Sequence, residues 1–163
     1  MALAFDDLLE AGEQLAAVLR QTESSVAVSE SAAGGLINAA LVAVPGASSF
    51  YKGGMVVYTS SAREVLAGNE PLPKGLRGAT EGFALVQARQ ARKLYRADWG
   101  IGETGATGPS GNPYGDAPGV GWVACSGPTE LTRELQTGSD DRQSNMYEFG
   151  IAAIELTLRA IRA

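Results

Sequence analysis

The chain has 163 residues, of which 45% are hydrophobic and 19% charged, a balance that fits one folded domain and excludes a disordered chain. Its formal net charge is −5, which argues against direct nucleic-acid binding, because such binding rests on basic residues. Histidine is absent and Cys125 is the one cysteine, so Ser-His-Asp and Cys-His catalysis, the usual zinc sites and an internal disulfide are excluded.

We expect neither a membrane-spanning segment nor a secretory leader from this sequence. Its apolar runs all fall short of the roughly 18 residues that a bilayer-spanning helix needs. The first ten residues, MALAFDDLLE, are acidic, whereas a secretory leader begins with basic residues and an apolar run. We therefore expect a cytoplasmic protein whose acid–base chemistry depends on Lys, Tyr, Asp, Glu, a terminal amine or water.

The first predicted elements are a helix, a strand and a second helix. Apolar residues in segment 3–20 repeat at helical spacing and predict an amphipathic helix that serves packing. Next come residues 24–40, SSVAVSESAAGGLINAA. They predict a short strand over 25–28, a tight turn, and a helix over 32–44 that Pro45-Gly46 ends.

The turn between this strand and helix holds Ser31, the first candidate nucleophile. The start of a helix leaves backbone N–H groups unpaired, and N–H groups of residues 32–35 could stabilise a negative oxygen beside the serine. Ser31 could equally be the N-cap of the helix, since serine is a preferred cap. Gly34 and Gly35 could serve only close packing of the helix against the sheet, and the local spacing does not decide between these interpretations.

A second strand and two more helices follow. Residues 55–58, MVVY, predict the strand, and Gly53-Gly54 before it would permit close backbone approach or a bulge. A short helix is predicted over 61–67, then a loop over 69–78 and a helix over 81–95. The last of these helices carries a basic stripe, which we interpret as a solvated face: Arg89, Arg92, Lys93 and Arg96.

The longest irregular region begins at the end of a third strand, predicted over 99–104. Residues 102–119 read GETGATGPSGNPYGDAPG and include six glycines. Long loops inside compact domains are often functional, and unhindered N–H groups could cradle a phosphate or a carboxylate. The alternative is a surface loop without a ligand. The segment matches neither a P-loop nor the dinucleotide fingerprint.

The last elements are a hairpin and a helix. Strands are predicted over 120–126 and 131–137, antiparallel and joined by a turn at Gly127-Pro128. Asp140 and Asp141 then open the final helix. Helix and strand alternate early and a hairpin comes late. The chain therefore predicts one α/β domain, a three-layer α/β/α sandwich on a mixed, mostly parallel sheet of about five strands.

Several segments, in order, resemble the C-terminal domain of the CinA family of competence- and damage-inducible proteins, some of which are nicotinamide-nucleotide amidases. The matching segments are SESAAGGLINAAL with VPGASSFYKGG and MVVYTSSAREVLAG, then GATEGFALVQA, ETGATGPSGNPYGDAPGVGWVAC and GSDDRQSN. They cover nearly the whole chain, and their shared order is more specific than any one of them. The chain begins directly at the first helix of that domain and so resembles the stand-alone form.

The resemblance implies a serine-lysine amidase that converts nicotinamide mononucleotide to nicotinate mononucleotide and ammonia, and we expect no cofactor and no metal. The family's serine falls on Ser31, Glu30, Gly34 and Gly35 also match, and its tyrosine falls on Tyr58. The resemblance also carries over a hydroxyl residue and an arginine, and the loop is expected to help hold a substrate phosphate. The expected substrate-binding residues are Gly34, Gly35, Thr104, Gly105, Thr107, Gly108, Ser110, Gly111 and Arg142.

The family's lysine aligns with Arg63, which is a serious chemical departure. A desolvated lysine amine can take a proton from serine, whereas a guanidinium stays protonated. If the chemistry survives, the base is another residue, and the candidates are Lys52, Tyr58 and Glu30. Arg63 could instead hold Ser31 or a substrate phosphate through a bidentate contact.

Three functions are therefore open. The first is an amidohydrolase acting on a small nucleotide carboxamide, with Ser31 as nucleophile. The second is a ligand-binding module that kept the pocket and lost turnover. The third is a protein-interaction partner of the recombination machinery, suggested by the family name. A homo-oligomer is expected from the family and from the frequency of symmetric oligomers among soluble enzymes.

Overall fold

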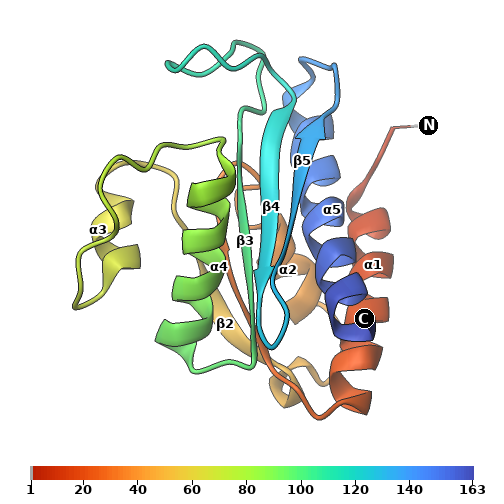
Figure 1. Ribbon diagram of the computed structural model, residues 1–163. Coiled ribbons are helices and arrows are strands. Elements are labelled where there is room, and N and C mark those ends of the chain that lie inside the picture. The colour runs from red at the N-terminus through yellow and green to blue at the C-terminus, as the bar shows by residue number, and fades with distance from the viewer. Residues whose placement is uncertain (1) are drawn as a thin grey trace.

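A five-stranded sheet in the order β2-β1-β3-β4-β5 organises the computed structural model, which describes residues 2–163 (Figure 1). The strands are β1 (Val26–Glu30), β2 (Tyr51–Val56), β3 (Trp99–Gly105), β4 (Val120–Ser126) and β5 (Leu131–Gln136). The helices are α1 (Phe5–Gln21), α2 (Leu36–Val42), α3 (Ala62–Ala67), α4 (Glu81–Tyr95) and α5 (Arg142–Arg162), with a 3-10 turn, η1 (Ala47–Ser49).

The sheet is mixed, and β4 is the one strand that runs against the others. β1 is parallel to both β2 and β3, whereas β4 is antiparallel to β3 and to β5. Helices cover both faces, with α3 and α4 on one side and α1, α2 and α5 on the other (Figure 1). The predicted three-layer α/β/α sandwich on a mixed, mostly parallel sheet is confirmed.

Glycines on β3 let α4 lie unusually close to the sheet. A Cβ atom on Gly100 would collide with the main-chain oxygen of Ala88, and one on Gly102 with that of Ala84. The helix presents a buried small-residue face there, as Ala84, Ala88 and Ala91 are fully buried. Side chains that are short on both partners therefore bring the start of α4 close to the end of β3, where the candidate site lies.

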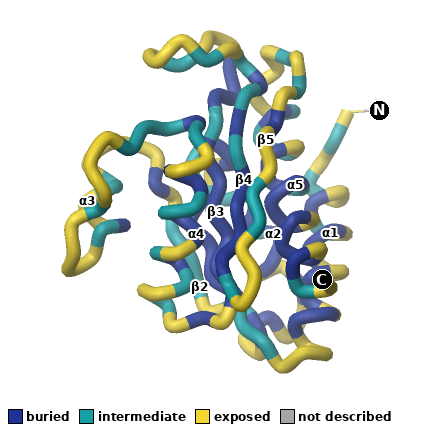
Figure 2. The backbone as a smooth tube through the Cα atoms, viewed as in Figure 1, coloured by how far each residue is buried: buried dark blue, intermediate teal, exposed yellow. Residues whose placement is uncertain are grey.

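The larger core lies between the sheet and the helices α1, α2 and α5. Leu8, Leu15 and Leu19 of α1 are fully buried, and Ile101 and Phe149 pack into the same cluster. Each such side chain contributes roughly 1.5–3 kcal/mol by burial. Figure 2 shows the central strands buried between the helices, while the segment around α3 and the tip of the loop after β3 stay largely exposed.

The strand predicted over 55–58 lies earlier in the chain, at Tyr51–Val56, so that prediction was wrong. Gly53 and Gly54 are inside the strand rather than before it. The register with β1 jumps from Val26 opposite Tyr51 to Ala27 opposite Gly53, which is a bulge of the kind expected at these glycines. A Cβ atom on Gly54 would collide with the side chain of Asn38, so glycine lets the edge strand close against α2.

The helix predicted from residue 32 begins only at Leu36. Residues 32–35 form a turn, because Gly34 and Gly35 adopt φ angles of 68° and 104° that other residues rarely adopt. The N-cap is Gly35, so Ser31 does not cap the helix. This correction leaves the Ser31 side chain free of a structural role at the helix start.

The remaining elements agree with their predictions within a few residues. Helix α4 spans residues 81–95 as predicted, and β4 and β5 form the expected antiparallel hairpin. Asp141 caps α5 by accepting a hydrogen bond from the N–H of Ser144. Within residues 2–163, none of the helices is both long enough and apolar enough to cross a bilayer.

Candidate active site

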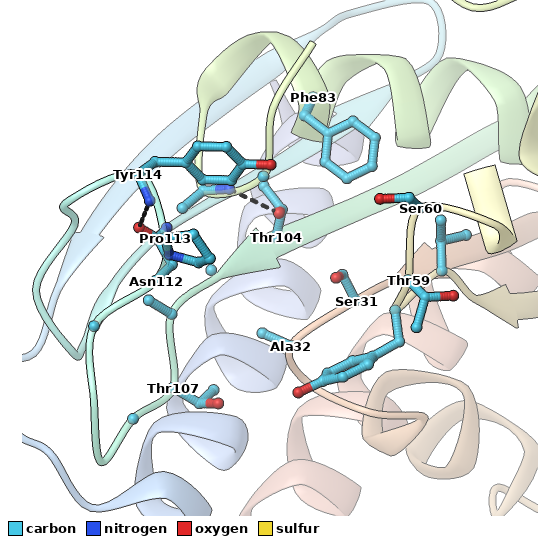
Figure 3. Close-up of a pocket in the computed structure, with 18 of the residues that line it drawn as sticks. Ser31, Ala32, Thr59, Ser60, Phe83, Thr104, Thr107, Asn112, Pro113 and Tyr114 are labelled. Atoms are coloured by element: carbon cyan, nitrogen blue, oxygen red, sulfur yellow. Dashed lines mark hydrogen bonds between the residues drawn. The ribbon is translucent and has the colours of Figure 1, made fainter.

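A cavity of about 380 Å³ opens at the carboxyl ends of β1 and β3 (Figure 3). The chain leaves β1 toward β2 on one side, whereas β3 lies on the other, so the cavity sits where the strand order switches direction. Open α/β sheets bind their ligands at such points. Its walls come from the turn after β1, the segment after β2, the start of α4, the loop after β3 and the first residue of α5.

Ser31 stands at the floor of this cavity, directly after β1. Its backbone N–H donates to Oε2 of Glu103 at 2.9 Å, which fixes the position of the residue. Figure 3 shows its hydroxyl pointing into the open centre, between Thr104 and Ser60. Within the described chain this hydroxyl has no hydrogen-bond partner, so it is available to a ligand.

Glu30 is fully buried and serves the start of α2 rather than the cavity. Its Oε1 accepts from the N–H groups of Gly35 (2.6 Å) and Ile37 (3.3 Å). Its Oε2 accepts from the N–H (2.9 Å) and the side-chain amide (2.8 Å) of Asn38. Burial raises the pKa of Glu30, although these hydrogen bonds oppose the shift. The structure does not support Glu30 as a base, because its carboxylate is occupied and does not line the cavity.

Glu103 is a site residue that the sequence analysis missed. The N–H groups of Ser31 and Ala33 both donate to its Oε2 at 2.9 Å. Its side chain is fully buried, and Oε1 has no hydrogen-bond partner within residues 2–163. Burial raises its pKa to about 8 despite these hydrogen bonds, and the neighbouring charge of Glu30 adds to the rise. The feature of the sequence that could have indicated this residue is a single carboxyl group within an otherwise uncharged strand.

The expected oxyanion donors of the turn are therefore largely engaged. The N–H of Ala33 binds Glu103, that of Gly34 binds the oxygen of Ser31 at 3.1 Å, and that of Gly35 binds Glu30. Neither Gly34 nor Gly35 lines the cavity, so neither is placed to bind substrate, and both instead form the turn. On the opposite wall, the N–H groups of Thr107 and Gly108 have no partner in the described chain.

Three expected site residues meet on the wall formed by the loop and α5. Arg142 donates from Nη2 to the Tyr58 hydroxyl at 2.8 Å and from Nη1 to the Gly108 oxygen at 2.6 Å. Tyr58 lies just beyond β2 and is 60% exposed. The three residues come from segments far apart in the sequence, and all three line the cavity. The arrangement places a guanidinium group between the loop and the tyrosine.

Arg63 also lines the cavity, but it is not bound to Ser31. Its Nη1 donates to the oxygen of Leu76 at 2.9 Å, and its Cζ lies 4.3 Å from the centroid of the Phe83 ring. These contacts hold the guanidinium on the side of α3 and the loop before α4. Lys52, the other basic candidate, lies near the start of β2, at the opposite end of the sheet, and does not line the cavity.

The other expected loop residues gather in the cavity. Thr104 is almost fully buried, and its Oγ1 accepts from the N–H of Ala79 at 2.9 Å, which ties β3 to the segment before α4 (Figure 3). Gly105, Thr107, Gly108, Ser110 and Gly111 all line the cavity. The sequence analysis did not single out Asn112 or Tyr114, which form the outer wall.

An ion pair fastens this loop from outside. Arg77 lies 2.7 Å from Asp116, whose other partner is the side-chain amide of Asn112 at 2.7 Å. Arg77 also lies 5.1 Å from the Tyr114 ring. The loop is thus tied to the segment before α4.

The cavity is positive, because Arg63 and Arg142 line it and no carboxylate among residues 2–163 does. Such a cavity suits an anionic ligand. Among the described residues, no three Cys, Asp or Glu side chains cluster as metal ligands would. The hydroxyl groups of Ser31, Tyr58 and Thr107 are among the polar groups that line the cavity.

The profile of the CinA C-terminal domain matches residues 9–161. The chain belongs to the CinA family. A CinA-like protein of Anaeromyxobacter sp. (strain K) is 36% identical over 154 residues, covering 94% of this chain and 38% of that protein. A CinA-like protein of Salinibacter ruber is 30% identical over 164 residues, covering 97% of this chain and 40% of that protein. The chain thus spans about two fifths of the length of these relatives.

Solved structures of CinA proteins share the fold. The competence/damage inducible protein CihA from Agrobacterium tumefaciens superposes with a TM-score of 0.86 at 26% identity, covering 100% of both chains. The competence or damage-inducible protein from Enterobacter asburiae gives a TM-score of 0.85 at 26% identity, covering 94% of this chain and 98% of that one. The resemblance to the CinA family noted in the sequence is confirmed.

Proposed function

We propose that the cavity is the active site of a small-molecule amidohydrolase resembling the nicotinamide-nucleotide amidases, with a nucleotide carboxamide as substrate. The observation that carries the proposal is the position of Ser31. Its backbone is fixed by Glu103, while its unpaired hydroxyl points into a cavity lined by two guanidinium groups. Such an arrangement suits a serine nucleophile beside an anionic substrate.

The phosphate of the substrate lies against the wall of Arg142 and the loop. Arg142 is already oriented by Gly108 and Tyr58, so little side-chain freedom is lost when it also contacts a phosphate. The free N–H groups of Thr107 and Gly108 supply further donors on the same wall. The carboxamide then extends toward Ser31.

The reaction proceeds in two steps. Oγ of Ser31 forms a bond to the carboxamide carbon, the C–N bond breaks, and the nitrogen leaves as ammonia with the serine proton. Water then cleaves the ester, which releases the carboxylic acid and restores Ser31. Tyr58 carries the proton, because Tyr58 is the one of the three candidate bases that lines the cavity. Arg142 donates to the Tyr58 oxygen and thereby orients the phenol.

A second function, binding of the same ligand without turnover, is favoured by Arg63. The family's lysine is replaced by a guanidinium that is held by Leu76 and Phe83 and cannot accept a proton. No lysine or carboxylate lines the cavity within the described chain. In this case nicotinamide mononucleotide binds and no ammonia is released.

The test measures both binding of nicotinamide mononucleotide and release of ammonia and nicotinate mononucleotide. The proteins compared are the wild type, Ser31→Ala, Arg63→Lys and, as a matched control, Ser48→Ala, an exposed serine outside the cavity. Turnover by wild type and Ser48→Ala that is lost in Ser31→Ala supports the amidase. Binding without product, with turnover gained in Arg63→Lys, supports the second function. Absence of both binding and turnover in all four proteins contradicts both.

A further inference from the structure

The turn that carries Ser31 is built around a buried carboxyl group that the proposed chemistry does not use. The N–H groups of Ser31 and Ala33 converge on Oε2 of Glu103, as the N–H groups of an anion-binding nest converge on a ligand. The second oxygen, Oε1, is buried and has no partner among residues 2–163. A buried carboxylate with a bare oxygen is costly, whereas a neutral carboxyl group costs far less.

We propose that Glu103 is a positioning residue of the cavity, which fixes Ser31 through the backbone and whose charge controls the binding of an anionic ligand. This inference rests on the proposed function only in its choice of ligand. While the group is neutral, Oε2 still accepts both N–H groups, and the turn keeps its geometry. When the group ionises, a negative charge appears directly behind Ser31, in a cavity that is otherwise positive, and it repels a phosphate.

The surroundings of Glu103 support this behaviour. Burial is the main cause that raises its pKa to about 8, and Glu30 on β1 adds to the rise. On α4, Gln87 donates to the main-chain oxygen of Glu103 and leaves its carboxyl group alone. Val123 lies opposite Glu103 on β4, where Cys125 is two residues further on.

The cationic groups of the site lie toward the cavity. Arg63 of α3 and Arg142 of α5 line it, but neither is hydrogen-bonded to Glu103. Their contacts with Leu76, Gly108 and Tyr58 leave the Glu103 carboxyl group unpaired. Glu103 is therefore free to change its charge without breaking an ion pair.

The experiment measures the affinity for nicotinamide mononucleotide from pH 6.5 to pH 9.5. Wild-type affinity is expected to fall roughly tenfold across this range, the effect of one charge about 10 Å from the ligand at an effective dielectric of about 20. Glu103→Gln keeps the acceptor oxygen and is expected to retain wild-type affinity at pH 6.5 with a flat profile. Glu155→Gln, an exposed carboxyl on α5, is the matched control and keeps the wild-type profile. The same fall in Glu103→Gln as in wild type overturns the inference.

A second measurement needs no ligand and separates this inference from the proposed function. Amide hydrogen exchange at Ser31 and Ala33 is expected to be equally slow in wild type and Glu103→Gln at pH 6.5, and at least tenfold faster in Glu103→Ala. If nicotinamide mononucleotide does not bind, this pattern still supports the positioning role while the proposed function fails. Unchanged exchange in Glu103→Ala, measured on protein that remains folded, overturns the positioning role.

Discussion

The two walls of the cavity differ in whether their backbone N–H groups have hydrogen-bond partners inside the protein. On the wall after β1, the N–H groups of Ser31 and Ala33 donate to Glu103, and behind this wall those of Gly35 and Asn38 donate to Glu30. On the wall formed by the loop after β3, Thr107 and Gly108 leave their N–H groups open within the described chain, beside the guanidinium of Arg142.

This difference shows how one cavity can combine a rigid serine with an open anion site. Internal carboxyl groups satisfy the donors of the first wall, so an external anion gains little there and Ser31 is held in place. The second wall offers unpaired donors and positive charge, so an anionic group is attracted to it. Substitution of residues on either wall should reduce this difference between the two walls.

The largest expected effect is on the pH dependence of stability, through Glu103. In the unfolded chain this carboxyl group ionises near its ordinary pKa of 4.5, whereas in the folded protein its pKa is about 8. The folded state therefore binds more protons between these values, and the free energy of unfolding falls as pH rises through them. Chemical denaturation should show a loss on the order of 4 kcal/mol for wild type relative to Glu103→Gln across this window. If the free energy of unfolding changed with pH in the same way for both proteins, this prediction would be contradicted.

Removal of Glu30, the carboxyl group behind the first wall, should destabilise the start of α2. Glu30→Ala leaves the N–H groups of Gly35, Ile37 and Asn38 without their acceptor inside the protein. The free energy of unfolding should drop by about 3 kcal/mol, because buried donors without partners are costly. Denaturant titration measures this, with Glu13→Ala on the exposed face of α1 as a control expected to change it by less than about 0.5 kcal/mol.

On the second wall, Arg142→Ala removes the contacts with Gly108 and Tyr58 and one of the two charges in the cavity. Affinity for nicotinamide mononucleotide should fall roughly 30-fold, since a hydrogen bond to a charged group contributes about 1.5–3 kcal/mol. Calorimetry at low and high salt measures the loss. Arg162→Ala, an exposed arginine at the end of α5, should bind like wild type. Equal affinities of Arg142→Ala and wild type would show that the phosphate lies elsewhere.

The smallest effect on stability is expected for the Arg77–Asp116 ion pair that holds the loop. Arg77 lowers the pKa of Asp116, so the stability that the pair contributes is present above the ordinary pKa of 3.8 and is lost as pH falls below it. Both side chains are partly exposed, and Asp116→Asn should therefore cost less than about 1 kcal/mol at pH 7. Thermal unfolding at pH 7 and pH 3 should show the difference between the two proteins shrinking at the lower pH. A difference that grows instead would contradict this account.

The sequence by itself determined the order of elements, the α/β class and the family. Periodicity and breakers placed α4 at residues 81–95 and the β4–β5 hairpin, because helix caps, turn residues and apolar spacing are local properties. Motifs in order pointed to Ser31, Tyr58 and Arg142, all of which line one cavity. These residues could be named because each stands within a short segment that resembles the family.

Only the tertiary structure decided which groups of the site are hydrogen-bonded to one another. Ser31 and Glu103 are 72 residues apart, and no local pattern indicates that the N–H of one donates to the carboxyl group of the other. The same contact engages donors of the turn that local reasoning had left open for an oxyanion. The early start of β2 likewise depends on Gly54, where a side chain would collide with Asn38 of α2. Burial and long-range hydrogen bonds arise only when segments pack. They determine which polar groups are paired with other groups of the protein and which remain available to a ligand.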